Sequence, residues 1–304
     1  MDETNNRVII EARDLAKKYG RTEALKGISF TLTEGEVLGY IGPNGAGKTT
    51  TIRLILGLLN ASSGQISVFG ENPRKAPLSI LSEVGYIPGE FGLWPSMTGD
   101  QCLDYLASLH TKPPKRQEEL CERFEFSFKD LDRSTRFYSR GMRQKVAVIQ
   151  AFQHVPRLVI MDEPTEGLDP VMKDRFVELV REHRAEGGTV LYSSHILSEV
   201  EDCADRVAVL RKGEIVKSAA IESLAADKVR HCVVVLKSAV ADRSVFEISG
   251  LSDLRGDDRT IRFDFRGDMA PLFRVLGTLQ VEDFVAERES LTEAFFEVYG
   301  DEAS

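Results

Sequence analysis

The chain has 304 residues, of which 42% are hydrophobic and 29% charged, and its formal net charge is −9. This composition is typical of a globular protein and excludes a disordered or fibrous one. The acidic balance excludes a global positive field that would collect nucleic acid, so we expect no nucleic-acid partner. The apolar runs are far shorter than the roughly 18 residues of a membrane helix, and residues 1–6 are unlike a signal peptide. We expect the chain itself to stay outside the membrane.

Strand-like stretches alternate with helical ones up to about residue 218. The strand-like stretches are 8–10, 37–41, 158–161, 189–192 and 206–210. Several are apolar throughout, as parallel strands covered on both faces tend to be. The alternation predicts an α/β core with a largely parallel sheet. A polar, helical pattern after residue 97 predicts a helical insertion over about 97–157.

The pattern changes again after about residue 231. Strands are expected at 232–236 and 260–265, and helices at about 269–279 and 290–299. These elements predict a small α+β domain, which divides the chain into domains at 1–226 and 227–304. The four cysteines are scattered without a C-x-x-C pair, which fits a reduced, cytosolic compartment.

A glycine-rich loop directly follows the stretch 37–41 and opens a helical run over 48–59. The loop matches the pattern G-x-x-x-x-G-K-[ST] with Gly42, Pro43, Asn44, Gly45, Ala46, Gly47, Lys48 and Thr49, and Thr50 follows it. Glycines let backbone N–H groups wrap phosphates, and the helix N-terminus places partial positive charge there. Lys48 is expected to neutralise the outer phosphates and Thr49 to ligate Mg²⁺. The loop predicts a nucleotide site, but it does not decide between kinase, GTPase, motor and transporter.

Two acidic residues, at positions 162 and 163, directly follow the stretch 158–161. Such a pair is usually a solvated turn, but here the phosphate loop requires a Mg²⁺ partner. Asp162 is the candidate carboxylate that holds the ion, directly or through water. Glu163 is then the candidate general base that positions and polarises the attacking water. His195 is placed to contact the γ-phosphate or to hold that water, although alone it would be an ordinary loop histidine.

The stretch 138–144, Tyr-Ser-Arg-Gly-Met-Arg-Gln, resembles the signature motif of ABC ATPases. The order of phosphate loop, helical insertion, signature, acidic pair, the stretch Glu-Gly-Leu-Asp at 166–169 and His195 is similar to that family over roughly residues 7–220. The resemblance implies a P-loop NTPase core of ABC type with an antiparallel β subdomain. It also implies ATP and Mg²⁺ as cofactors and ATP hydrolysis coupled to transport.

The resemblance assigns roles to further residues. Tyr19 looks like the aromatic residue that stacks on adenine, although a core position is its alternative. Ser139 and Gly141 stand where the signature contacts nucleotide, and Asp169 looks like the acid that couples two sites. In the family, the signature of one subunit covers the γ-phosphate bound by the other. The resemblance therefore implies a dimer, expected here as a homodimer, with two nucleotides between its subunits.

One position departs from the family pattern. Gly89 stands where the family has a glutamine that contacts Mg²⁺ and the attacking water. Glu90 is a substitute candidate for the metal ligand, and an exposed position is its alternative, because an acid near phosphate is repelled unless Mg²⁺ offsets the charge. Hydrolysis is therefore expected to be slower or differently coupled.

We interpret the chain as the ATP-hydrolysing subunit of an exporter, held at the cytoplasmic face of the cell membrane by a separate transmembrane permease. The segment 91–136 corresponds to the family region that docks the permease. The C-terminal stretch, including 290–296, looks like the small domain of drug and antibiotic resistance exporters. Two alternatives stay open: a soluble ABC ATPase acting on the ribosome or nucleic acid, and a weakly hydrolysing nucleotide-binding regulatory module. The sequence does not identify the transported substrate.

Overall fold

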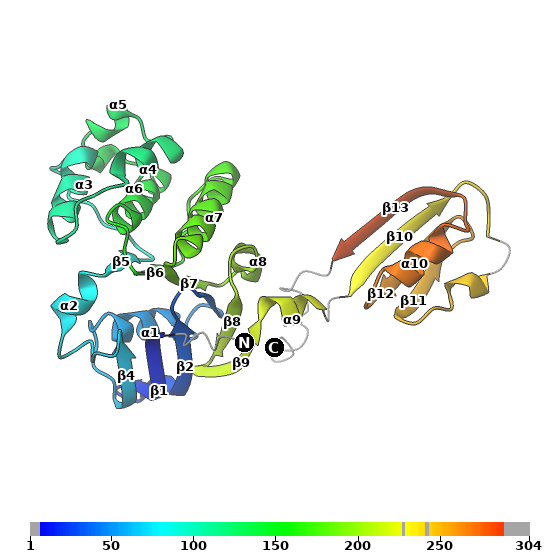
Figure 1. Ribbon diagram of the computed structural model, residues 1–304, viewed down its shortest axis with the longest axis horizontal. Helices are drawn as coiled ribbons and strands as arrows, with labels where there is room; N and C mark the ends of the chain where they lie inside the picture. The colour runs from blue at the N-terminus through cyan, green and yellow to red at the C-terminus, as the bar shows by residue number, and fades with distance from the viewer. Residues whose placement is uncertain (1–6, 227–228, 241–242, 289–304) are drawn as a thin grey trace. The chain divides into compact units, whose positions relative to one another are not determined.

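The computed structural model describes residues 7–226, 229–240 and 243–288 of the chain (Figure 1). The chain forms two compact units, Met1–Ala219 and Ala220–Ser304, and each has a hydrophobic core of its own. The expected domain boundary after residue 226 stays a prediction. The expected helix at 290–299 lies outside the described residues.

A six-stranded sheet forms the centre of the first unit. Its strand order is β5 (Val84–Ile87), β6 (Leu158–Asp162), β7 (Thr189–Ser194), β3 (Val37–Ile41), β8 (Arg206–Arg211) and β9 (Glu214–Ala220). The first five strands pair in parallel. Every residue of β3, β6 and β7 is buried, so both faces of these strands are covered. The predicted α/β core with a largely parallel sheet is confirmed.

A separate antiparallel sheet has the order β2 (Thr22–Thr33), β1 (Val8–Tyr19) and β4 (Ser63–Val68). Its strands are longer than the stretch 8–10 that the sequence indicated. A glycine is required at one point, because a Cβ on Gly64 would lie 2.1 Å from the Asp14 carbonyl oxygen. This sheet is the antiparallel β subdomain that the family resemblance implied.

The helical insertion contains α3 (Gly99–Ser108), α4 (Gln117–Arg123), α5 (Phe128–Leu131), the short 3₁₀ helix η1 (Thr135–Phe137) and α6 (Arg140–Phe152). Figure 1 shows these helices gathered together. Thr98 fixes the start of α3, because its hydroxyl accepts from the Gln101 N–H while the Gln101 side chain accepts from the Thr98 N–H. The other helices of this unit are α1 (Lys48–Ile55), α2 (Pro77–Leu81), α7 (Pro170–Ala185) and α8 (Leu197–Glu201). Within the described part of the chain, no helix has the length and apolar character that a membrane span requires.

The second unit contains an antiparallel sheet with the order β11 (Leu251–Gly256), β12 (Thr260–Phe265), β10 (Arg230–Leu236) and β13 (Val281–Arg288). Among its described residues, the helices are α9 (Ile221–Ala226), η2 (Arg243–Phe246) and α10 (Ala270–Leu276). Apolar side chains of β10, β12, η2 and α10 form its core. The strands predicted at 232–236 and 260–265 and the helix at about 269–279 are confirmed, and the unit is α+β as expected.

Candidate active site

The carboxyl ends of three neighbouring parallel strands bring the predicted site residues together. Ile41 at the end of β3 pairs with Ser194 of β7, and Ser193 pairs with Asp162 at the end of β6. The phosphate loop follows β3, Glu163 follows β6, and His195 follows β7. Ligands of open α/β sheets bind at this edge, outside the carboxyl ends of the strands.

The phosphate loop depends on its glycines. Gly45 and Gly47 have φ values of 80° and 115°, in the left-handed region that favours glycine. A Cβ on Gly42 would lie 2.3 Å from the Leu210 carbonyl oxygen, and one on Gly47 would lie 2.7 Å from the carbonyl oxygen of Ala24. Because α1 begins at Lys48, its N-terminal N–H groups point into the loop, where they can bind phosphate oxygens.

Lys48 places a buried cation at the centre of the site. The residue is 6% exposed, and its Nζ donates to the Gly42 carbonyl oxygen at 2.6 Å. The same Nζ lies 3.2 Å from the Glu163 Oε1 atom. The ammonium group therefore lies between the phosphate loop and the candidate general base.

Asp162 and Thr49 form the candidate metal site. The Thr49 hydroxyl donates to Asp162 Oδ2 at 2.7 Å, and the Ser193 hydroxyl donates to Asp162 Oδ1 at 3.0 Å. Because Asp162 is only 4% exposed, water has little access to its carboxylate, and the two hydroxyl groups fix the orientation of the carboxylate. Burial, and then the charge of Asp162, raise the pKa of nearby Tyr86 to about 12, so this phenol stays neutral. A hydroxyl and a carboxylate are oxygen donors of the kind Mg²⁺ prefers, and they fit this ion.

Glu163 and His195 lie within hydrogen-bonding distance. Glu163 Oε2 is 2.8 Å from His195 Nδ1 and accepts from the His195 backbone N–H at 3.3 Å. Glu163 has a φ of 51°, which is unusual for a residue with a side chain. Its backbone N–H donates to the Ser193 carbonyl oxygen at 3.0 Å, which helps to hold this conformation. Such strained positions are concentrated at functional sites.

These groups enclose a cavity of about 240 Å³. It is lined by Ala24, Pro43, Asn44, Gly45, Gly47, Lys48, Thr49, Thr50, Gly89, Asp162 and Glu163. Gly42 and Ala46 belong to the loop but do not line the cavity. Ala24 comes from β2 and was not predicted, because nothing in the sequence places this strand against the loop.

Gly89 lies beside Asp162 in the nucleotide cavity, whereas Glu90 lies outside that cavity. A Cβ on Gly89 would lie 3.5 Å from the Asp162 carbonyl oxygen and 3.6 Å from its Oδ2 atom. Glu90 is exposed and lines a second cavity of about 860 Å³, together with Arg136, Arg140 and other residues. Gly89 lines both cavities, and Glu90 does not line the cavity of Asp162. This placement gives no support to Glu90 as a metal ligand.

The remaining predicted residues lie outside the nucleotide cavity. Tyr19 ends β1 with 45% of its surface exposed, and the Lys17 ammonium lies over its ring, 5.1 Å from the ring centroid. It is therefore not the core residue of the alternative interpretation, and its stacking on adenine stays a prediction. Ser139 is the N-cap of α6 and accepts from the Met142 N–H at 3.2 Å. Asp169 is the N-cap of α7 and accepts from the Met172 N–H at 3.0 Å. The structure thus explains local roles for Ser139 and Asp169, and their roles toward nucleotide stay predictions.

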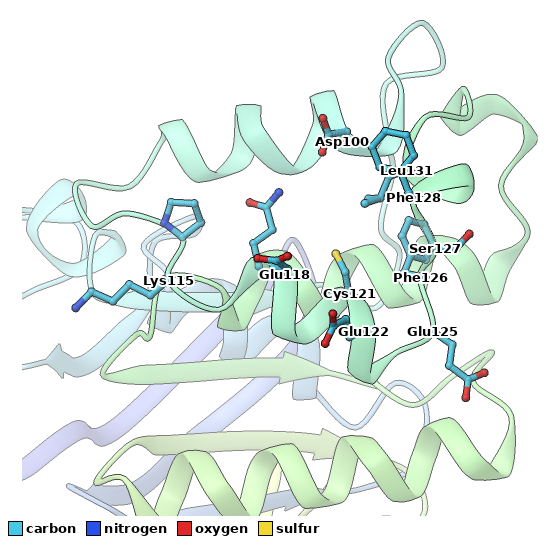
Figure 2. Close-up of a pocket in the computed structure, with 12 residues that line it drawn as sticks. Asp100, Lys115, Glu118, Cys121, Glu122, Glu125, Phe126, Ser127, Phe128 and Leu131 are labelled. Atoms are coloured by element: carbon cyan, nitrogen blue, oxygen red, sulfur yellow. The ribbon is translucent and has the colours of Figure 1, made fainter.

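A larger hollow of about 740 Å³ lies on the helical insertion (Figure 2). Its charged lining consists of Lys115 and four acids, Asp100, Glu118, Glu122 and Glu125. Four carboxylates against one ammonium group repel a triphosphate. The phosphate loop, and not this hollow, therefore suits a nucleotide.

The parallel sheet, the glycine-rich loop at the start of α1 and the acids at the end of β6 define a P-loop nucleotide-binding protein. A family model described as "ABC transporter" matches residues 25–166. The linearmycin resistance ATP-binding protein LnrL of Bacillus subtilis (strain 168) is 36% identical over 212 residues, which cover 68% of each chain. The bacitracin transport ATP-binding protein BcrA of Enterococcus faecalis is 30% identical over 269 residues, which cover 88% of this chain and 87% of BcrA.

Solved structures agree with this similarity. One, an ATP-binding subunit of an ABC transporter, has a TM-score of 0.67 and 31% identity, and the match covers 71% of this chain and 91% of that one. The cassette MJ0796, solved as a dimer bound to ADP and Pi, shares the fold with a TM-score of 0.63 and 21% identity over 70% of this chain and 99% of its own. The chain belongs to the family of ABC transporter ATP-binding proteins. It is an ATPase subunit whose hydrolysis of ATP serves transport.

Proposed function

We propose that this subunit powers export through a separate transmembrane permease, and that it acts at the cytoplasmic face of the membrane as a homodimer with two ATP molecules between its subunits. The names of LnrL and BcrA, which refer to resistance and to transport of an antibiotic, support export. The single observation that carries the catalytic part is the contact of Glu163 with both Lys48 and His195 at the edge of the nucleotide cavity.

Different residues of the cavity have separate roles in ATP hydrolysis. The loop N–H groups and Lys48 bind the phosphates, which concentrates positive charge where negative charge develops in the transition state. Thr49 and Asp162 would hold Mg²⁺, which when bound neutralises phosphate charge. Glu163 accepts a proton from the attacking water, and His195 orients the Glu163 carboxylate through Nδ1.

A second nucleotide contact follows from α6. Ser139 caps this helix, and the N–H groups of its first turn form a potential anion site. The phosphate loop of the same chain already has its own helix terminus, at α1. We therefore assign the α6 terminus to the nucleotide of another subunit, as in a head-to-tail dimer. MJ0796, a cassette of the same fold, forms a dimer.

Substitution of Glu163 tests this function. Glu163→Gln keeps the size of the side chain and removes the base, so we expect a loss of ATP turnover of roughly 10²- to 10⁴-fold. Size-exclusion chromatography with ATP and Mg²⁺ is expected to show a stable dimer of this variant, because bound ATP is no longer consumed. Glu118→Gln, which removes the same charge from the acidic hollow, is the control and is expected to behave as wild type.

The alternative, a weakly hydrolysing regulatory module, is favoured by one observation, the glycine at position 89 beside Asp162. Equal turnover by wild type and Glu163→Gln, after contaminating activity is excluded, would disprove the role of Glu163. Absence of turnover in the wild type, even with its membrane partner, would establish the alternative instead.

A further inference from the structure

The signature helix α6 is fastened to the turn that follows Glu163. The Gln144 side-chain amide donates to the Pro164 carbonyl oxygen at 2.5 Å. A Cβ on Gly141 would lie 2.9 Å from the Gly167 carbonyl oxygen, so helix and turn approach as closely as a glycine permits. The N-terminus of α6 and the base of the same chain are therefore parts of one packed structure.

Arg140 is the first residue of α6, and its side chain crosses from this helix to the turn that follows Glu163. Its guanidinium forms an ion pair with Glu166, and its side chain is 62% exposed. The aliphatic part of the Arg140 side chain packs over Gly167. A Cβ added to Gly167 would lie 3.1 Å from Cγ and 3.3 Å from Cδ of Arg140. Side chains of a helix tilt toward its N-terminus, so the guanidinium lies near the end that Ser139 caps.

The ion pair of Arg140 is easily exchanged. An exposed pair of this kind contributes about 0 to 1 kcal/mol, because water screens it and both side chains lose freedom. A carboxylate and a phosphate both offer arginine two parallel, charge-assisted hydrogen bonds, but the γ-phosphate carries more negative charge and, between two subunits, is screened less by water than the exposed Glu166. An anion presented to the α6 terminus would therefore compete successfully with Glu166.

We propose that Arg140 leaves Glu166 and binds the γ-phosphate of the ATP held by the phosphate loop of the second subunit. This inference rests on the proposed head-to-tail dimer, which places the α6 terminus over that nucleotide. ADP has no γ-phosphate, so the exchange takes place only with ATP. Arg140 thereby lets the dimer distinguish ATP from ADP, and Glu166 holds the guanidinium until ATP arrives.

The test measures the dissociation constant of the ATP-bound dimer by analytical ultracentrifugation, in the Glu163→Gln background. Arg140→Gln is expected to raise this constant by about tenfold or more. Arg140→Lys is expected to give a smaller increase, because an ammonium keeps the charge and lacks the planar fork. Arg143→Gln, which removes the same charge one turn along α6, is the control and is expected to leave the constant unchanged. Association in ADP is expected to be the same for all variants.

Glu166→Gln separates this role from a structural one. Loss of the competing carboxylate frees Arg140, so we expect the ATP-bound dimer to become tighter. If Arg140 and Glu166 only brace the turn, both substitutions will weaken the dimer, and that result would overturn the inference. A dimer insensitive to Arg140→Gln, or equally sensitive to Arg143→Gln, would overturn it too, with the proposed function intact. Absence of any ATP-dependent dimer in the Glu163→Gln parent would overturn the proposed function, and this inference with it.

Discussion

Gly89 leaves one side of Asp162 without a neighbouring side chain. Its own Cβ position lies at ordinary van der Waals distance from Asp162, 3.5 to 3.7 Å, and its φ does not require glycine. Gly89→Gln is therefore expected to fold normally and to place an amide beside the carboxylate. Because an amide there can orient the attacking water, we expect the turnover number to rise about two- to tenfold. Steady-state ATP hydrolysis by the purified protein measures the effect.

The matched control is Gly92→Gln. A Cβ on Gly92 meets no atom within 4 Å, and this residue lines only the second cavity. Its substitution is expected to leave ATP turnover unchanged. If Gly89→Gln lowers turnover or leaves it unchanged, then the missing glutamine is not what limits hydrolysis.

Two histidines join the ends of two helices. His110 follows α3 and His154 follows α6, and their rings stack with centroids 3.6 Å apart. Burial lowers the pKa of both, that of His154 to about 4. Since an unfolded histidine titrates near pH 6.5, the unfolded chain binds more protons between about pH 6.5 and pH 4. The stability from neutral His154 is thus complete above about pH 6.5 and is lost as the pH falls toward 4.

His154→Phe tests this account, because it keeps a flat ring that does not titrate. Between about pH 7 and about pH 5 the wild type is expected to lose more free energy of unfolding than the variant, by on the order of 1 to 2 kcal/mol. Urea denaturation at both pH values measures the difference. Equal losses in the two proteins would show that the His154 imidazole is protonated as easily in the folded state as in the unfolded one.

Among the helices and strands, some could be predicted from the sequence and others could not. The strands 37–41 and 260–265 were predicted to the residue, because apolar and alternating runs carry a strong local signal. β2 was missed: its residues Glu23 and Lys26 interrupt the pattern, and pairing with the long β1 stabilises it instead. β4 begins with Ser-Gly-Gln, which by itself is typical of a turn. Tertiary pairing determines these two strands.

The site could be predicted where residues follow strands of one parallel sheet. The phosphate loop, Asp162, Glu163 and His195 come together because β3, β6 and β7 end at one edge. Contacts that cross between elements gave no such signal. The approach of Ala24 to the loop and the ion pair of Arg140 with Glu166 depend on how β2 and α6 pack, which no local pattern encodes.

At the scale of the whole molecule, the two units have separate cores. A protein truncated after residue 226 keeps the complete core of the first unit, so we expect it to fold and to bind ATP. We propose that the second unit supports or regulates the dimer, and that truncation weakens ATP-dependent dimerisation. Sedimentation of the truncated Glu163→Gln variant, next to its full-length form, measures this loss. Unchanged dimerisation and unchanged ATPase activity of the truncated wild type would argue against such a role.

The position of Gly89 in the walls of two cavities has a mechanical consequence. Glycine has no side chain, and its backbone adopts a wider range of φ and ψ values than that of any other residue. The partition at Gly89 is therefore thin and compliant. A group that enters the second cavity is separated from the wall beside Asp162 only by this backbone segment, with no side chain between them.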